Sequence, residues 1–75
     1  MMVKLSRVEH DKVVKIEKFI TDHYITRTLW EIGIIPYGVY RVKNKLSCGK
    51  IVVGNGNFKV ALDITVAEQI LVRKI

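Results

Sequence analysis

Three side chains in the sequence are chemically suited to metal binding: the imidazoles of His10 and His23 and the thiol of Cys48. Their separations match none of the common ligand motifs, and sites for transition metals usually combine several such side chains with carboxylates. We therefore expect no metal site and no cofactor. Cys48 falls between two predicted strands, where we expect an inert residue. A reactive thiol, or an oxidative link between two copies, is the alternative.

The sequence offers no constellation for catalysis. Its carboxylates are scattered singly, so no acid–base pair stands out. It has no phosphate-binding loop ending in Gly-Lys-Ser/Thr, so we do not expect the chain to hydrolyse GTP. The stretch Gly54-Asn55-Gly56 precedes a predicted strand and not a helix, which indicates a turn. We expect a protein that is not an enzyme.

Trp30 is the residue best suited to recognising another protein. On a helical wheel it lies away from the apolar face of its predicted helix, and Arg27 lies one turn before it. Exposed tryptophan and arginine are typical of interaction hot spots. Glu31 follows directly, and Tyr37 adds an aromatic ring beyond the helix. We hypothesise that Arg27, Trp30, Glu31 and Tyr37 form a partner-binding patch. The alternative is that Trp30 packs against the edge of the barrel or against the chain after Gly33.

These residues are positioned by a helix whose two ends can be recognised in the sequence. Thr21 or Asp22 can accept hydrogen bonds from the free N–H groups of the first turn. Gly33 stands where a helix ends in a left-handed residue, Ile34 can fold back onto the last turn, and Pro36 stops the helix. The apolar positions at helical spacing are Ile25, Leu29 and Ile32. They predict one buried face.

Five short strands account for most of the remaining chain. Alternating apolar and polar residues predict them at 12–19, 37–44, 50–53, 58–63 and 70–75. Asn55-Gly56 is a strong signal for a two-residue hairpin. Thr65 to Glu68 fits a capping box, which predicts a helical turn before the last strand. The fold we predict is mainly β: a small, partly open barrel with one helix after the first strand.

Composition limits the class of protein. The chain has 75 residues, enough for one domain spanning 1–75, and its single cysteine excludes an internal disulfide. No stretch approaches the roughly 20 apolar residues that cross a bilayer, and residues 1–10 contain no apolar leader. A cytoplasmic location is therefore the default expectation. The net charge of +6 suggests an acidic partner, nucleic acid, or simply a solvated surface.

Three stretches of the sequence together carry a family likeness. They are Arg27-Thr28-Leu29-Trp30-Glu31-Ile32-Gly33-Ile34, then Pro36-Tyr37-Gly38 leading into the strand of Tyr40, then Val60-Ala61-Leu62 followed by Ala67-Glu68-Gln69-Ile70-Leu71-Val72. Their order and spacing resemble the FeoA family of ferrous iron transport proteins over roughly residues 11–75. The chain departs from the family pattern at Tyr37, at the turn 46–49 and at Asp63.

The resemblance implies an SH3-like barrel and a role as a small adaptor in ferrous iron uptake. Its partner would be FeoB, a membrane transporter with a cytoplasmic GTPase domain. The protein would then be cytoplasmic, reaching the inner face of the membrane through that partner. Whether it activates or inhibits transport, and whether it self-associates, the sequence leaves open.

A second function is a small basic barrel that binds nucleic acid. The positive charge and the neighbouring Tyr37, Tyr40 and Arg41 motivate it, since such barrels stack bases on aromatic rings along a basic groove. No basic run is longer than Arg73-Lys74, so the sequence favours the adaptor.

Overall fold

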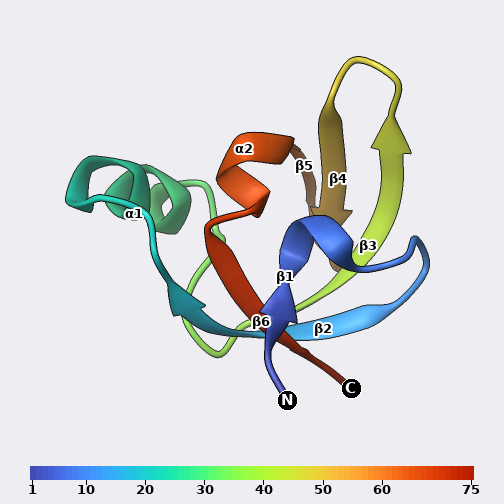
Figure 1. Ribbon diagram of the computed structural model, residues 1–75, viewed down its shortest axis with the longest axis horizontal. Helices are drawn as coiled ribbons and strands as arrows, with labels where there is room; N and C mark the ends of the chain where they lie inside the picture. The colour runs from blue at the N-terminus through green and yellow to red at the C-terminus, as the bar shows by residue number, and fades with distance from the viewer.

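The computed structural model describes residues 1–75 and is built on one antiparallel sheet. The elements are β1 (Val3–Lys4), η1 (a 3₁₀ helix, Leu5–Arg7), β2 (Val13–Phe19), α1 (His23–Glu31), β3 (Val39–Leu46), β4 (Lys50–Gly54), β5 (Lys59–Asp63), α2 (Ile64–Ala67) and β6 (Ile70–Lys74). The strand order is β1-β6-β2-β3-β4-β5, so β1 and β5 are the edge strands and each is paired on one side only. Figure 1 shows the strands curving around a common interior. The predicted mainly β, partly open, SH3-like barrel is confirmed.

The core lies inside this curved sheet and is entirely apolar. Val14 and Ile16 of β2 and Tyr40 and Val42 of β3 are buried, as their alternation predicted. The full set of buried hydrophobic residues is Leu5, Val8, Val14, Ile16, Leu29, Ile34, Tyr40, Val42, Ile51, Val53, Leu62, Ala67, Ile70 and Val72. No polar or charged residue is buried.

Two β-bulges help the sheet to curve. The β2–β6 register shifts between Ile16 and Lys18, and the β3–β4 register shifts between Val42 and Asn44. An extra residue on one strand bends that strand and increases its twist. The small sheet can therefore wrap around its core without flat, exposed ends.

Helix α1 begins and ends as its sequence predicted. The Asp22 carboxylate accepts a hydrogen bond from the Ile25 amide at 2.9 Å. At the other end Gly33 has a φ of +101°, the Gly33 amide donates to the Trp30 carbonyl, and the Ile34 amide donates to the Leu29 carbonyl. This pair of bonds is the Schellman motif. It returns the chain to the core, where Ile34 is buried.

The predicted burial of Ile32 is wrong. Ile32 is the C-cap residue of α1, and its side chain is 41% exposed. The chain has already begun to turn there, so the helical spacing from Leu29 no longer sets the direction of the side chain.

The N-terminal segment contributes elements that the sequence did not predict. Val3 of β1 pairs with Val72 of β6, and Leu5 and Val8 are fully buried. The sheet therefore has six strands where five were predicted. The other strands begin and end within two residues of their predicted bounds.

The predicted two-residue hairpin at Asn55-Gly56 is wrong. Gly54 pairs with Lys59, so residues 55–58 form a four-residue connection. Neither Asn55 nor Gly56 has a positive φ. The Asn55 side chain instead accepts a hydrogen bond from the Asn57 amide at 2.8 Å, which closes a local Asx turn.

The predicted capping box at Thr65 to Glu68 is also wrong, although the helical turn itself is present. Helix α2 begins at Ile64, so Asp63 is the N-cap, and no side chain caps the helix. The Asp63 carboxylate is 2.5 Å from the Lys50 ammonium of β4. This hydrogen bond, and then the opposite charge, raise the pKa of Lys50. Asp63 thus joins two strands in place of capping a helix.

Candidate partner-binding surface

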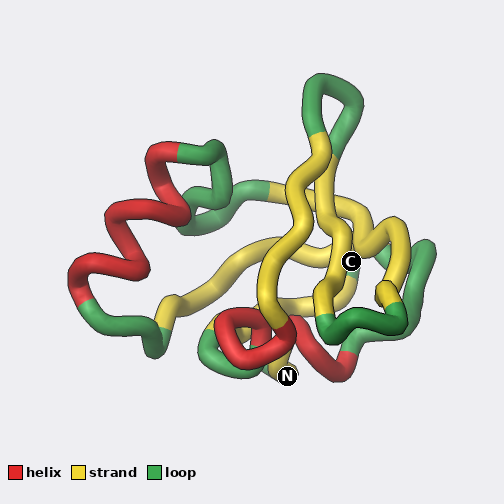
Figure 2. Tube along the Cα trace, turned by 90° about the horizontal axis from the view of Figure 1, so that it is seen from above, coloured by secondary structure: helices red, strands yellow, loops and turns green.

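Helix α1 stands at the side of the barrel and leaves most of its surface in solvent. Only Leu29 is buried, and Ile25 is half-buried against the core. Figures 1 and 2 both show the helix beside the strands and not across them. No helix of the protein has the length and apolar character to cross a bilayer. Because most of its residues are exposed, α1 is accessible to a partner.

A hollow of about 410 Å³ lies along one face of α1. Its walls are His23, Thr26, Arg27 and Trp30, which are spaced as neighbours on a helix. Trp30 is 51% exposed, so the ring is accessible while its other half is covered. The structure thus brings Arg27 and Trp30 together, as the hypothesis of a patch required.

The remaining predicted residues lie differently. Glu31 is exposed at the end of α1, and no ion pair joins it to Arg27. Tyr37 is exposed but belongs to another surface: its amide donates to the Ile16 carbonyl at 2.8 Å. The Lys15 ammonium lies 5.8 Å from the centre of the Tyr37 ring. Three of the four predicted residues therefore share α1, and Tyr37 lies beside β2.

Tyr24 is a candidate that sequence reasoning missed. Its side chain is 75% exposed in the first turn of α1, one turn before Arg27. Its position off the Ile25–Leu29 face was the signal that could have identified it. The exposed aromatic residues of the helix are thus Tyr24 and Trp30.

Tyr40 fixes the connection between α1 and β3. Its hydroxyl donates to the Gly33 carbonyl at 2.6 Å and accepts from the Ile35 amide at 3.1 Å. The ring meets Phe58 edge-on, with centroids 6.2 Å apart. A side chain at Gly38 would place its Cβ only 2.8 Å from two atoms of the same ring. These contacts hold the end of α1 although little of the helix is buried.

The burial of Tyr40 also bears on nucleic-acid binding. Its ring is only 4% exposed and both hydrogen-bonding roles of its hydroxyl are used, so it cannot stack on a base. Of the two tyrosines that motivated this function, only Tyr37 is accessible. The structure therefore offers a poorer stacking surface than the sequence suggested.

The metal-binding residue types are dispersed. No group of three or more His, Cys, Asp and Glu side chains lies close enough to hold an ion. His23 lies in the hollow on α1, and Cys48 is exposed in the three-residue connection between β3 and β4. Figure 1 shows this hairpin projecting from the barrel.

The sequence matches no known protein-family model and no curated protein. The fold, in contrast, matches several solved protein structures. An iron uptake regulatory protein (FeoA) superposes with a TM-score of 0.87 at 23% identity, covering 100% of this chain and 99% of that one. A FeoA-like protein from Clostridium acetobutylicum superposes with a TM-score of 0.85 at 20% identity, covering 99% of this chain and 87% of that one. A manganese-dependent transcriptional repressor superposes with a TM-score of 0.89 at 21% identity. This match covers 99% of this chain but only 42% of the repressor.

These likenesses define the fold. The protein is a small SH3-like barrel with an exposed helix at its side. More particularly, it has the fold of the FeoA proteins, which it matches over nearly the whole length of both chains.

Proposed function

We propose that this protein is a FeoA-type regulator of ferrous iron uptake that acts by binding a FeoB-type transporter and not by catalysis. The observation that carries the proposal is the full-length structural match to an iron uptake regulatory protein. The match to the repressor covers only part of that longer protein, so it gives less support to a role in transcription. The proposed place of action is the cytoplasm, at the inner face of the membrane.

The α1 surface is the proposed contact. Trp30 offers a large, rigid ring beside a hollow that a partner's side chain can enter. Arg27 forms no ion pair within the protein, so its guanidinium is available to a carboxylate of the transporter. An aromatic anchor next to an arginine is the composition typical of an interaction hot spot.

The proposal is tested by titrating the labelled protein with two preparations of the transporter. One is its cytoplasmic GTPase domain, and the other is the full transporter in detergent, each with GDP or with a GTP analogue. We expect saturable binding to at least one of them. If a folded sample binds neither preparation in either nucleotide state, the proposal is wrong.

The contact surface is tested by Trp30→Ala. We expect the variant to lose about 2 kcal/mol of binding free energy, roughly a thirty-fold rise in Kd. Its fold should persist because half of the Trp30 side chain is already in solvent. Ile20→Ala is the matched control, since Ile20 is 54% exposed and lies outside α1. Equal affinity of the Trp30 variant and the unmodified protein would exclude α1 as the contact.

A further inference from the structure

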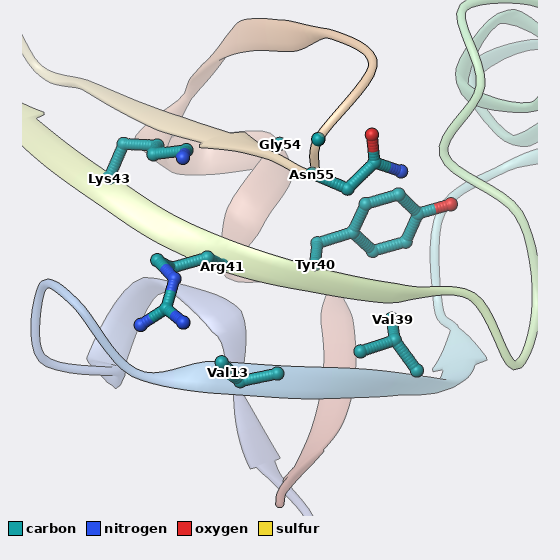
Figure 3. Close-up of a pocket in the computed structure, with 8 residues that line it drawn as sticks. Val13, Val39, Tyr40, Arg41, Lys43, Gly54 and Asn55 are labelled. Atoms are coloured by element: carbon teal, nitrogen blue, oxygen red, sulfur yellow. The ribbon is translucent and has the colours of Figure 1, made fainter.

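A second surface, distinct from α1, lies where β2 and β3 meet the connection between β4 and β5. Here it is called the β2–β3 groove. It encloses about 250 Å³ and is shown in Figure 3. Its lining residues are Val13, Val39, Tyr40, Arg41, Lys43, Gly54, Asn55 and Gly56. None of them belongs to α1, and neither the fold nor the proposed contact explains why this surface is hollowed and basic.

Strand register places apolar and basic side chains side by side on β2 and β3, with Val13, Val39 and Arg41 lining the groove and Lys15 beside it. Val13 pairs with Arg41, and Lys15 pairs with Val39, so all four project from the same outer face. Gly54 pairs with Arg41 on the other side. Gly54 lines the groove through its backbone, since a side chain there would collide with the Phe58 carbonyl and with Lys59.

Lys43 is directed by the β3 bulge. It is the residue between Val42 and Asn44 at which the β3–β4 register shifts, so it has no partner on β4. A bulge re-aims the side chain of its extra residue. Lys43 lines the groove together with Arg41, and Figure 3 shows Lys43 on the β4 side of β3 and Arg41 extending toward β2.

The positive charge of the groove is only partly compensated. Arg41 donates to the Asp11 carbonyl at 2.9 Å and lies 3.6 Å from the Asp11 carboxylate. Neither Lys15 nor Lys43 takes part in any of the protein's four ion pairs. The groove cations Arg41 and Lys43 and the neighbouring Lys15 therefore have a single paired carboxylate among them, that of Asp11, which is 77% exposed.

The ligand that fits these features must be acidic and partly apolar. Val39 is 46% exposed, so it supplies an apolar contact between the cations Lys15 and Arg41. An extended peptide alternates its side chains with a period of two, as does the face that it would cover. A single-stranded nucleic acid would satisfy the charge, but the one aromatic residue that lines the groove, Tyr40, is buried and offers no stacking surface.

We propose that the β2–β3 groove binds an extended acidic segment of a partner protein, in which carboxylates meet Lys15, Arg41 and Lys43 and an apolar residue packs on Val13 and Val39. The segment is held by side chains and does not extend the sheet, because β2 and β3 are each paired on both edges. This binding does not depend on α1 or on the identity of the transporter.

The test measures fluorescence anisotropy of a fluorescein-labelled peptide of about eight residues in which glutamate alternates with leucine or serine. A peptide of the same length with lysine in place of glutamate is the control ligand. We expect the acidic peptide alone to bind, with an affinity that falls as salt rises from roughly 50 to 200 mM, since exposed charges are screened. Failure of the acidic peptide to bind at low salt would overturn the proposal.

Charge-reversal variants locate the binding. Lys43→Glu should raise the Kd of the acidic peptide by at least about tenfold, which is the effect of losing one charge-assisted contact. Lys43→Arg should bind the peptide with unchanged affinity. Lys4→Glu on β1 changes the net charge equally and should have an effect of less than about threefold, because β1 is separated from β2 by β6. Equal losses of peptide affinity in Lys43→Glu and Lys4→Glu would show a general charge effect and would overturn the assignment of binding to the groove.

Two further measurements decide between ligands. Amide chemical shifts in the folded protein should move at residues 13–15, 39–43 and 54–56, and shifts confined to α1 would contradict the proposal. A labelled oligothymidine is titrated under the same conditions. Tighter binding of the oligonucleotide than of the acidic peptide would overturn the proposal in favour of a nucleic-acid groove.

Discussion

Tyr40 is a buried aromatic residue whose hydroxyl joins α1 to the barrel through two hydrogen bonds, with Gly33 and Ile35. Tyr40→Phe keeps the ring against Phe58 but leaves the Ile35 amide and the Gly33 carbonyl without this partner. We expect the free energy of unfolding to fall by about 1–3 kcal/mol, the usual cost of an unsatisfied buried polar group. Urea denaturation followed by circular dichroism measures it.

Tyr37→Phe is the matched control for this prediction. Tyr37 is 67% exposed and its hydroxyl has no hydrogen bond within the protein. We expect its removal to change stability by less than about 0.5 kcal/mol. Equal losses in the two variants would show that the Tyr40 hydroxyl does not hold the connection.

The difference between these tyrosines also shows how much of the site the sequence could give. The position of Trp30 off the apolar face followed from helical periodicity alone, and the structure places it beside Arg27. The position of Tyr37 could not follow from local spacing. It depends on a positive φ at Tyr37 and on a hydrogen bond from the Tyr37 amide to the carbonyl of Ile16, which lies on β2.

At the scale of elements, α1 is fixed more firmly at its C-terminal end than at its first turn. The Schellman bonds and the Tyr40 hydroxyl hold the C-terminal end, whereas the first turn is held by the Asp22 cap and by the hydrogen bond between the Thr21 and Thr26 hydroxyls. Asp22→Ala should cost about 0.5–2 kcal/mol of helix stability. Because α1 buries little, we expect local opening: amide hydrogen exchange should accelerate in residues 25–28 and stay unchanged in β3 and β4.

Glu31→Ala is the control for the capping prediction. It removes the same charge from the other end of α1, where a carboxylate is unfavourable to the helix dipole. Exchange in α1 should then stay the same or become slower. Uniform acceleration across the sheet in Asp22→Ala would contradict local opening and show that α1 unfolds only together with the barrel.

The accuracy of sequence reasoning at this scale follows the range of the interactions. Both ends of α1 were predicted because Asp22 and Gly33 act on backbone groups within five residues of themselves. The capping box failed because α2 begins at Ile64, so Thr65 lies inside the helix and Asp63, whose carboxylate pairs with Lys50 of a distant strand, is the N-cap residue. A local motif predicts a structure only where no distant partner competes for its residues.

At the scale of the whole molecule, the two ends of the chain complete the barrel together. β1 pairs only with β6, which lies almost the whole chain away in sequence. A strand of two residues has too short a pattern to be recognised by alternation. The interior beside β6 is covered by Leu5 and Val8, so the N-terminal segment is part of the core although no sequence signal marked it.

The contribution of this segment is tested by Leu5→Ala. Leu5 is 1% exposed within the core cluster, so the truncation should leave a cavity and cost about 2–5 kcal/mol. That is a large share of the roughly 5–15 kcal/mol that stabilises a typical domain, and a small barrel has little to spare. We expect the urea midpoint to fall steeply, with Met2→Ala, at a residue that is 47% exposed, as the nearly neutral control.

The same variant separates stability from recognition. In Leu5→Ala, the proposed transporter binding and the proposed acidic-peptide binding should decline together, in proportion to the unfolded fraction, because both surfaces are carried by one barrel. Trp30→Ala should reduce only the proposed transporter binding, and Lys43→Glu should reduce only the proposed acidic-peptide binding. A stable Leu5→Ala protein with full binding would show that the barrel closes without its N-terminal segment.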